Sequence, residues 1–102
     1  MRYKLKLPVI FRWNDGTEHT EGGFTSEVAL DSTMIHSSNC PPVGCHVRVE
    51  VLIPSPVPSG EEVRVECLGK VIRVNEQPGY NSFVVHGIFN DEDLMRQAQE
   101  VP

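Results

Sequence analysis

Short stretches of alternating polar and apolar residues, separated by Gly and Pro, most constrain how this chain can fold. The clearest is His46 to Val51, in which three valines would share one buried face of a strand. Val63 to Cys67 alternates in the same way, and a break of phase after it predicts a β-bulge near Gly69. Strands at such close spacing favour a small antiparallel barrel.

The N-terminal third contains a hairpin signal. Residues 3–13 are rich in β-forming residues and predict a strand, and Asn14-Asp15-Gly16 then predicts a tight turn. The returning strand would cover residues 17–30, with a bulge or bend at Gly22-Gly23 because glycine readily adopts positive φ. Residues 34–37 predict a short strand at most.

The C-terminal part continues the same pattern. Residues 54–60 contain three prolines and predict a loop, and Gln77-Pro78-Gly79-Tyr80 predicts a type II turn. Residues 82–89 predict the last strand. Asn90 is a suitable N-cap and acidic residues follow it, which predicts a short C-terminal helix over residues 91–99. We therefore expect one all-β domain over residues 1–102, with its strands within about residues 3–89.

Composition excludes several classes of protein. A formal net charge of −5 argues against binding of DNA or RNA, whose affinity comes mostly from broad Lys and Arg patches. No apolar run reaches the length of about eighteen residues that a membrane span needs. Three cysteines form an odd count without a disulfide framework, and no secretion signal opens the chain, so we expect a cytoplasmic domain with reduced thiols.

The basic residues are unevenly distributed. Of the nine Lys and Arg residues, four lie within residues 2–13, namely Arg2, Lys4, Lys6 and Arg12, and no carboxylate lies among them. Local potential, more than net charge, steers an encounter with a ligand, so this segment is a candidate site for an anionic ligand or partner. The alternative is a solvated strand face.

Several motifs together resemble those of the PilZ domain family, and the resemblance runs from about Arg2 to Phe89. They are Arg2-x-x-x-Lys6 followed by Leu7-Pro8-Val9-x-Phe11, then Gly23-Phe24-Thr25 ahead of Met34-Ile35, then Pro42-Val43-Gly44 leading into residues 46–54, and finally Gly69 to Val74. The resemblance implies a six-stranded antiparallel split barrel. It also implies binding of the bacterial second messenger cyclic di-GMP, which the best-known members of the family bind.

The family's ligand motifs are Arg-x-x-x-Arg and, after the second strand, Asp or Asn-x-Ser-x-x-Gly. On this chain the resemblance carries the first motif to Arg2 and Lys6, with Lys4 as supporting charge. It carries the second to Glu27, Ala29 and Ser32, so both motifs are degenerate. Lysine lacks the planar fork of arginine, alanine lacks the hydroxyl, and serine adds a Cβ where glycine lets the backbone approach. These departures predict weakened binding.

The sequence thus predicts a non-catalytic, PilZ-like regulatory module of bacterial second-messenger signalling, without a resident cofactor. The alternative is a nucleotide-independent adaptor that binds a protein partner or forms a homodimer. Catalysis is not expected, because Cys45 and His46 are adjacent on a strand and would point to opposite faces. A zinc site is a weaker alternative, because the Cys and His residues lack a paired C-x2-C spacing: His36, Cys40, Cys45, His46 and Cys67.

Overall fold

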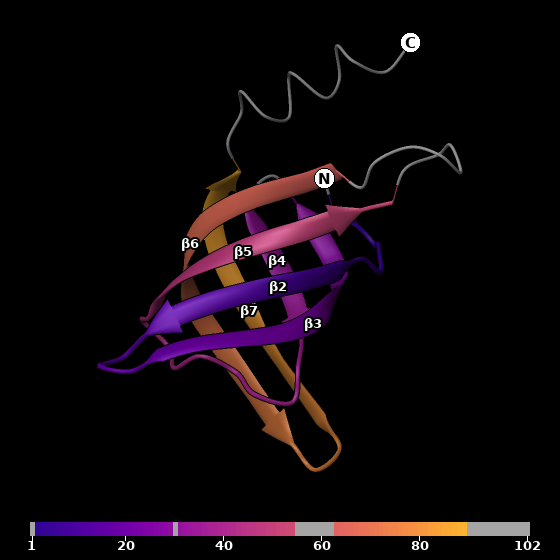
Figure 1. The fold of residues 1–102 in the computed structure, drawn as a ribbon. Coiled ribbons are helices and arrows are strands. Elements are labelled where there is room, and N and C mark those ends of the chain that lie inside the picture. The colour runs from indigo at the N-terminus through magenta and orange to yellow at the C-terminus, as the bar shows by residue number, and fades with distance from the viewer. Residues whose placement is uncertain (1, 30, 55–62, 90–102) are drawn as a thin grey trace, which may run out of the picture.

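The computed structural model describes residues 2–29, 31–54 and 63–89, and this part of the chain is all-β (Figure 1). Every strand pairing in it is antiparallel. No helix occurs among these residues, and the helix expected over residues 91–99 lies outside them. The strands are β1 (Arg2–Tyr3), β2 (Pro8–Asn14), β3 (Glu18–Ala29), β4 (Ser32–His36), β5 (His46–Ile53), β6 (Val63–Gln77) and β7 (Tyr80–Phe89).

The six longer strands form a closed barrel. The strand order is β1-β3-β2-β5-β6-β7-β4, and an additional pairing of β4 with β3 closes the sheet. The two-residue strand β1 pairs with the end of β3 outside this ring. The expectation of an all-β, six-stranded antiparallel barrel is therefore confirmed.

Apolar side chains from alternate positions fill the barrel. Phe11 and Phe83 are fully buried, and their rings meet edge to face with centroids 4.9 Å apart. The three valines of β5 are buried as the alternation predicts. Trp13 is buried and stacks on Phe11, with centroids 5.6 Å apart, so it is a core residue rather than an exposed stacking platform.

The two tight turns follow the predicted chemistry. In the first, the Asn14 side-chain oxygen accepts a hydrogen bond from the Gly16 backbone nitrogen at 2.9 Å, and Gly16 has a φ of 108°. In the second, Gly79 has a φ of 77° after Pro78, as a type II turn requires. Glycine is needed at both positions because other residues rarely adopt such angles.

The two predicted bulges lie elsewhere. Gly69 pairs regularly with Gly87, and the register shifts between Val71 and Arg73 instead. A Cβ at Gly69 would lie 2.7 Å from the His86 carbonyl oxygen, so the glycine allows β6 and β7 to approach closely. The bulge of β6 therefore lies closer to the C-terminus than predicted. Gly69 itself serves close packing and not a change of register.

The prediction for Gly22-Gly23 was also wrong. Both glycines pair regularly with β2, and neither has a positive φ. The register shift of β3 lies further on, between Thr25 and Glu27. A Cβ at Gly23 would collide with the His36 carbonyl oxygen, so this glycine permits close contact between β3 and β4.

The predicted N-terminal strand is interrupted. Residues 4–7 are not in a strand, and they are held to β3 by Thr25, whose side chain is fully buried. The Thr25 hydroxyl accepts a hydrogen bond from the Leu7 nitrogen at 2.9 Å and donates one to the Leu5 carbonyl oxygen. This side chain therefore fixes the path of the basic N-terminal segment across the barrel.

Candidate functional site

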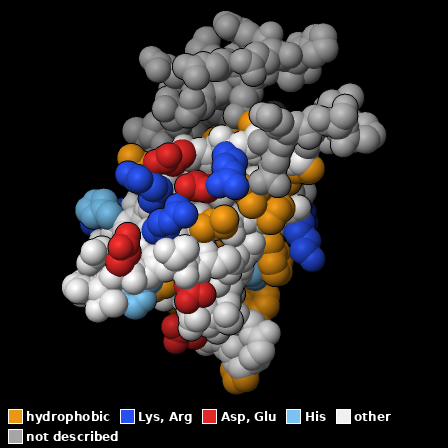
Figure 2. Space-filling model, viewed as in Figure 1, with side chains coloured by type: hydrophobic (Ala, Val, Ile, Leu, Met, Phe, Trp, Pro, Cys, Tyr) orange, Lys and Arg blue, Asp and Glu red, His pale blue; other side chains and the backbone are white. Residues whose placement is uncertain are grey.

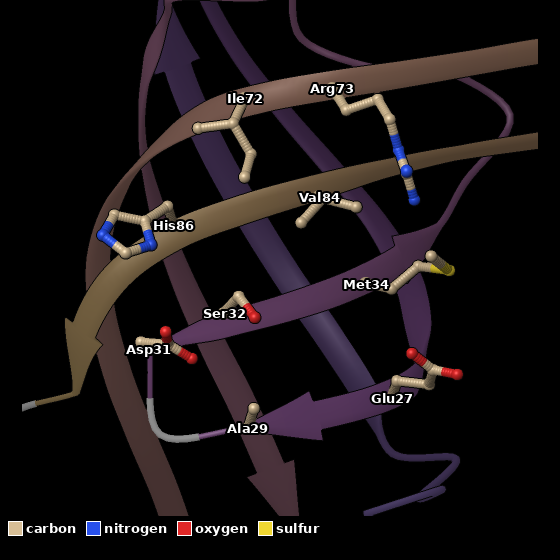
Figure 3. Close-up of a pocket in the computed structure, with 9 residues that line it drawn as sticks. All are labelled: Glu27, Ala29, Asp31, Ser32, Met34, Ile72, Arg73, Val84 and His86. Atoms are coloured by element: carbon tan, nitrogen blue, oxygen red, sulfur yellow. The ribbon is translucent and has the colours of Figure 1, made fainter. Parts of the chain in front are cut away.

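The ends of β3 and β4 meet β6 and β7 around a hollow of about 410 Å³ (Figure 3). Each of these four strands contributes two lining residues, and Asp31 lies just before β4. The lining residues are Glu27, Ala29, Asp31, Ser32, Met34, Ile72, Arg73, Val84 and His86.

Closure of the barrel brings these residues together. Ser32 on β4 pairs with His86 on β7, and Val84 on β7 pairs with Arg73 on β6. Both bulges of the barrel flank the hollow, since one directly precedes Glu27 and the other directly precedes Arg73. β-Bulges re-aim side chains and are common beside binding sites.

Three of the residues carried over from the family motif line this one hollow: Glu27, Ala29 and Ser32. The backbone of Arg2 pairs with Ala29, so β1 runs beside the rim of the hollow. Lys4 is exposed on the connection from β1 to β2.

Lys6 occupies a different position. It does not line the hollow, and its ammonium group lies 4.7 Å from the centre of the Phe24 ring, a cation–π contact. Phe24 stacks on His36, with centroids 5.3 Å apart, and His36 meets the edge of Tyr80 at 4.9 Å. The structure thus joins Lys6 to an aromatic cluster and not to Glu27, Ala29 and Ser32.

The hollow contains charges of both signs. Asp31 and Glu27 provide carboxylates, and Arg73 provides a guanidinium group that reaches across β7 toward β4 (Figure 3). Among the side chains that the structure describes, none forms an ion pair with Arg73. An arginine whose guanidinium group is not engaged in an ion pair can donate two parallel hydrogen bonds to a phosphate or to a guanine edge.

Sequence reasoning assigned no role to Arg73 or His86. Arg73 belongs to the run Gly69 to Val74 that contributed to the family resemblance, so its position was noticed but its orientation was not. The missing information was the pairing of β4 with β7, which places residues about fifty positions apart on one wall of the hollow.

The Cys and His residues were weighed as zinc ligands in the sequence. The described residues contain no group of three His, Cys, Asp or Glu side chains that could hold a metal ion. Cys67 is buried in the core, and its burial raises the pKa of the thiol to about 11. A thiol with that pKa is protonated at neutral pH and is a poor nucleophile or metal ligand.

The closed β-barrel is similar in fold to that of a PilZ-domain protein. A solved structure with this fold is that of the Bacillus subtilis inhibitor of motility (MotI/DgrA), a PilZ-domain protein. The TM-score is 0.66 at 12% sequence identity, and the match covers 99% of this chain and 51% of that chain. This chain therefore spans about half the length of that protein.

The other comparisons give no match. No family model matches this sequence, and no curated protein matches it significantly. The described residues include no helix that is long and apolar enough to cross a membrane.

Proposed function

We propose that this chain is a non-catalytic regulatory module of PilZ type that binds cyclic di-GMP in the hollow between β3, β4, β6 and β7. The observation that carries the proposal is the convergence of Glu27, Ala29 and Ser32 on one hollow of a PilZ-like barrel. The backbone of Arg2, the first position of the other family motif, lies next to Ala29. One position of the first motif therefore lies beside the second motif, whereas Lys6 does not.

The chemistry of the hollow suits this ligand. Cyclic di-GMP carries two phosphates and two guanines, so it needs cationic groups and hydrogen-bond acceptors. Arg73 supplies a guanidinium fork for a phosphate or for the acceptor edge of guanine. Asp31 supplies a carboxylate that accepts hydrogen bonds from the donor edge of guanine. We propose Lys4, an exposed residue just after β1, as supporting positive charge.

Binding should be weak. Ala29 offers no hydroxyl, and Lys6 would have to leave the Phe24 ring before it could reach a ligand in the hollow. Each lost polar contact costs on the order of 1 kcal/mol, and the cation–π contact about 0.5–1 kcal/mol. Together these losses weaken binding by about one to one and a half orders of magnitude relative to an intact motif.

Isothermal titration of about 100 μM protein with cyclic di-GMP tests the proposal, because that concentration detects a Kd in the micromolar range. We expect saturable heat that is lost in Arg73→Ala and retained in Lys70→Ala. Lys70 is a matched control, since it is an exposed cation of β6 that does not line the hollow. No heat with the unchanged protein, or equal heat with GMP, would contradict the proposal.

A nucleotide-independent interaction domain is the second candidate. It is favoured by large apolar side chains that remain exposed around the barrel: Tyr3, Leu5, Phe24, Val43, Leu68, Ile72 and Tyr80. Sedimentation velocity without nucleotide tests for a homodimer, and a monomer at all concentrations would count against one. The neighbour named as an inhibitor of motility gives a precedent for a regulatory protein with this fold.

The free thiols favour a cytoplasmic location.

A further inference from the structure

The outer face of β2, β5 and β6 carries both basic and acidic side chains. We call it the arginine face and define it by Arg12, Arg48, Arg64, Lys70, Glu50 and Glu66. Figure 2 shows basic side chains gathered around acidic ones on this side of the molecule. Four cations and two carboxylates leave an excess of two positive charges, although the whole chain carries −5.

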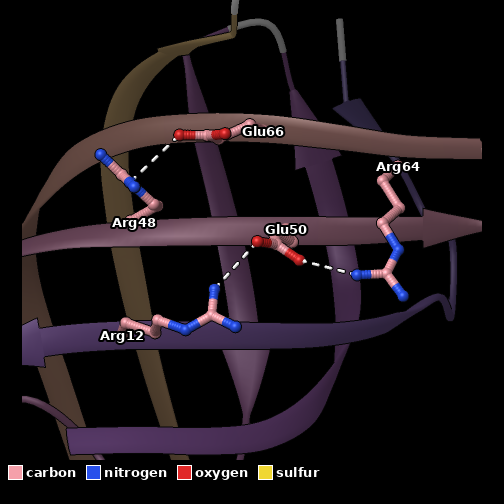
Figure 4. A network of polar contacts seen from close by, with 5 residues as sticks. All are labelled: Arg12, Arg48, Glu50, Arg64 and Glu66. Carbon is pink, nitrogen blue, oxygen red and sulfur yellow. Dashed lines mark hydrogen bonds and ion pairs between the residues drawn. The ribbon is translucent and has the colours of Figure 1, made fainter.

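Like charges face each other across the strands of this face. Arg12 is the direct partner of Arg48, and Glu50 is the direct partner of Glu66. Directly opposed like charges destabilise a sheet. The arrangement persists because the side chains form diagonal ion pairs between neighbouring rows (Figure 4).

These ion pairs hold the arginines in place. Glu50 contacts Arg12 at 2.9 Å and Arg64 at 3.3 Å, and Glu66 contacts the Nε atom of Arg48 at 3.1 Å. The contact of Arg48 therefore occupies one of five N–H donors. An arginine that is already oriented loses less conformational entropy when it binds a further carboxylate.

An apolar side chain continues the cross-strand row that Arg12 and Arg48 begin. Leu68 is the cross-strand partner of Arg48 and is 58% exposed. It lines a hollow of about 470 Å³ whose charged and imidazole side chains are Arg12, Arg48, His46 and Glu18. The face therefore offers an apolar anchor directly beside oriented guanidinium groups. Such a combination suits a partner that presents carboxylates around one apolar residue.

We propose that the arginine face docks an acidic segment of a partner protein, with an apolar side chain of that segment in the hollow at Leu68. Charge complementarity selects this occupant over a nucleic acid. Glu50 and Glu66 lie side by side among the cations, so a phosphate backbone that crosses the face meets repulsion there, whereas separate carboxylates can address single arginines. The proposal does not depend on nucleotide binding, because none of these residues lines the hollow at Glu27.

Fluorescence anisotropy with a labelled synthetic peptide, Glu-Asp-Glu-Leu-Glu-Asp-Glu, tests the proposal. We expect saturable binding that weakens several-fold between 50 and 300 mM NaCl, since exposed charges are screened by salt. Arg48→Ala should raise the Kd about fivefold and Leu68→Ala about threefold. A peptide with Gly in place of Leu should bind the unchanged protein as weakly as the intact peptide binds Leu68→Ala.

Two matched variants separate this surface from general charge and apolarity. Arg73→Ala removes the same charge from the other hollow, and Val43→Ala shortens a side chain that is 62% exposed in a loop. Both should bind the peptide normally. If Arg48→Ala is too unstable to test, Lys70→Ala takes its place, because it removes a cation of the same face without breaking an ion pair of the described residues. Absence of binding, equal weakening by Arg73→Ala, or tighter binding of a uridine decamer of single-stranded RNA would overturn the proposal.

Discussion

Arg12 on β2 and Arg48 on β5 are direct cross-strand partners, and each forms an ion pair with a carboxylate of the next row. The hydrogen bond from Arg12 is the main reason why the pKa of Glu50 lies below its ordinary value of 4.5. Glu50 also contacts Arg64, so its carboxylate joins all three strands of the arginine face. The mutual repulsion of the arginines is thus offset by a carboxylate that stays ionised into acid solution.

Glu50→Gln should therefore lower the free energy of unfolding at pH 7 by about 1 kcal/mol, the upper range for an exposed ion pair. A lowered pKa in the folded state stabilises the protein above the ordinary pKa, and this stabilisation is lost as pH falls through the folded value. Urea unfolding at several pH values should show the two proteins converging below pH 4.5. Glu66→Gln, at a single and more exposed ion pair, should have the smaller effect, and a difference that does not vary with pH would contradict this account.

Adjacent glycines of β3 provide a second test, because only Gly23 lies in close contact with β4. A Cβ at Gly23 would collide with the His36 carbonyl oxygen, whereas a Cβ at Gly22 would meet only the Val9 carbonyl oxygen at 3.9 Å. Gly23→Ala should lower the free energy of unfolding by about 1–3 kcal/mol through overpacking. Gly22→Ala should be neutral or stabilising by up to about 1 kcal/mol, since it restricts the unfolded chain. Chemical denaturation compares the two, and equal effects would show that β3 and β4 are not in close contact.

Cys67 gives the fold a dependence on alkaline pH. Its pKa rises from 9.0 to about 11 because its thiol is buried. A raised pKa in the folded state means that the stabilisation is complete below pH 9 and declines as pH rises toward 11, where the unfolded chain alone loses the proton. The free energy of unfolding should fall by up to about 1.4 kcal/mol per pH unit in this range. Cys67→Val should lack this component, and identical slopes for both proteins would contradict it.

The strands and turns of this fold were largely predictable from local patterns. The alternation of β5 and the turn residues Gly16 and Gly79 each determine a local conformation that the structure contains. The bulge at Gly22-Gly23 was predicted from the ability of glycine to adopt positive φ and the bulge near Gly69 from a break in the alternation, and in both strands the register shift lies further on. Gly23 and Gly69 instead allow close approach of neighbouring strands, and that requirement depends on which strand lies alongside.

The candidate site was predictable only in part, because it depends on how the barrel closes. Glu27, Ala29 and Ser32 are near each other in sequence, and the family motif located them. Arg73 and His86 reach the hollow because β7 pairs with β6 on one side and with β4 on the other, and no local pattern specifies the pairing of β4 with β7. The contact of Lys6 with Phe24 likewise follows from the path that Thr25 imposes on residues 4–7.

Restoring the family motif should convert weak nucleotide binding into tight binding. Glu27, Ala29 and Ser32 line the hollow, so Glu27→Asp, Ala29→Ser and Ser32→Gly place the motif's groups where the ligand is proposed to lie. At about 1 kcal/mol for each restored contact, the triple variant should lower the Kd for cyclic di-GMP about a hundredfold.

The controls for this experiment separate the motif from its surroundings. Arg73→Ala in the restored background should remove most of the gain, because its guanidinium group lies in the same hollow. Ser38→Gly in place of Ser32→Gly is the matched control, since Ser38 is an exposed serine that lines a different hollow. Isothermal titration compares the variants. A folded triple variant that gives no saturable heat would show that this hollow is not a nucleotide site.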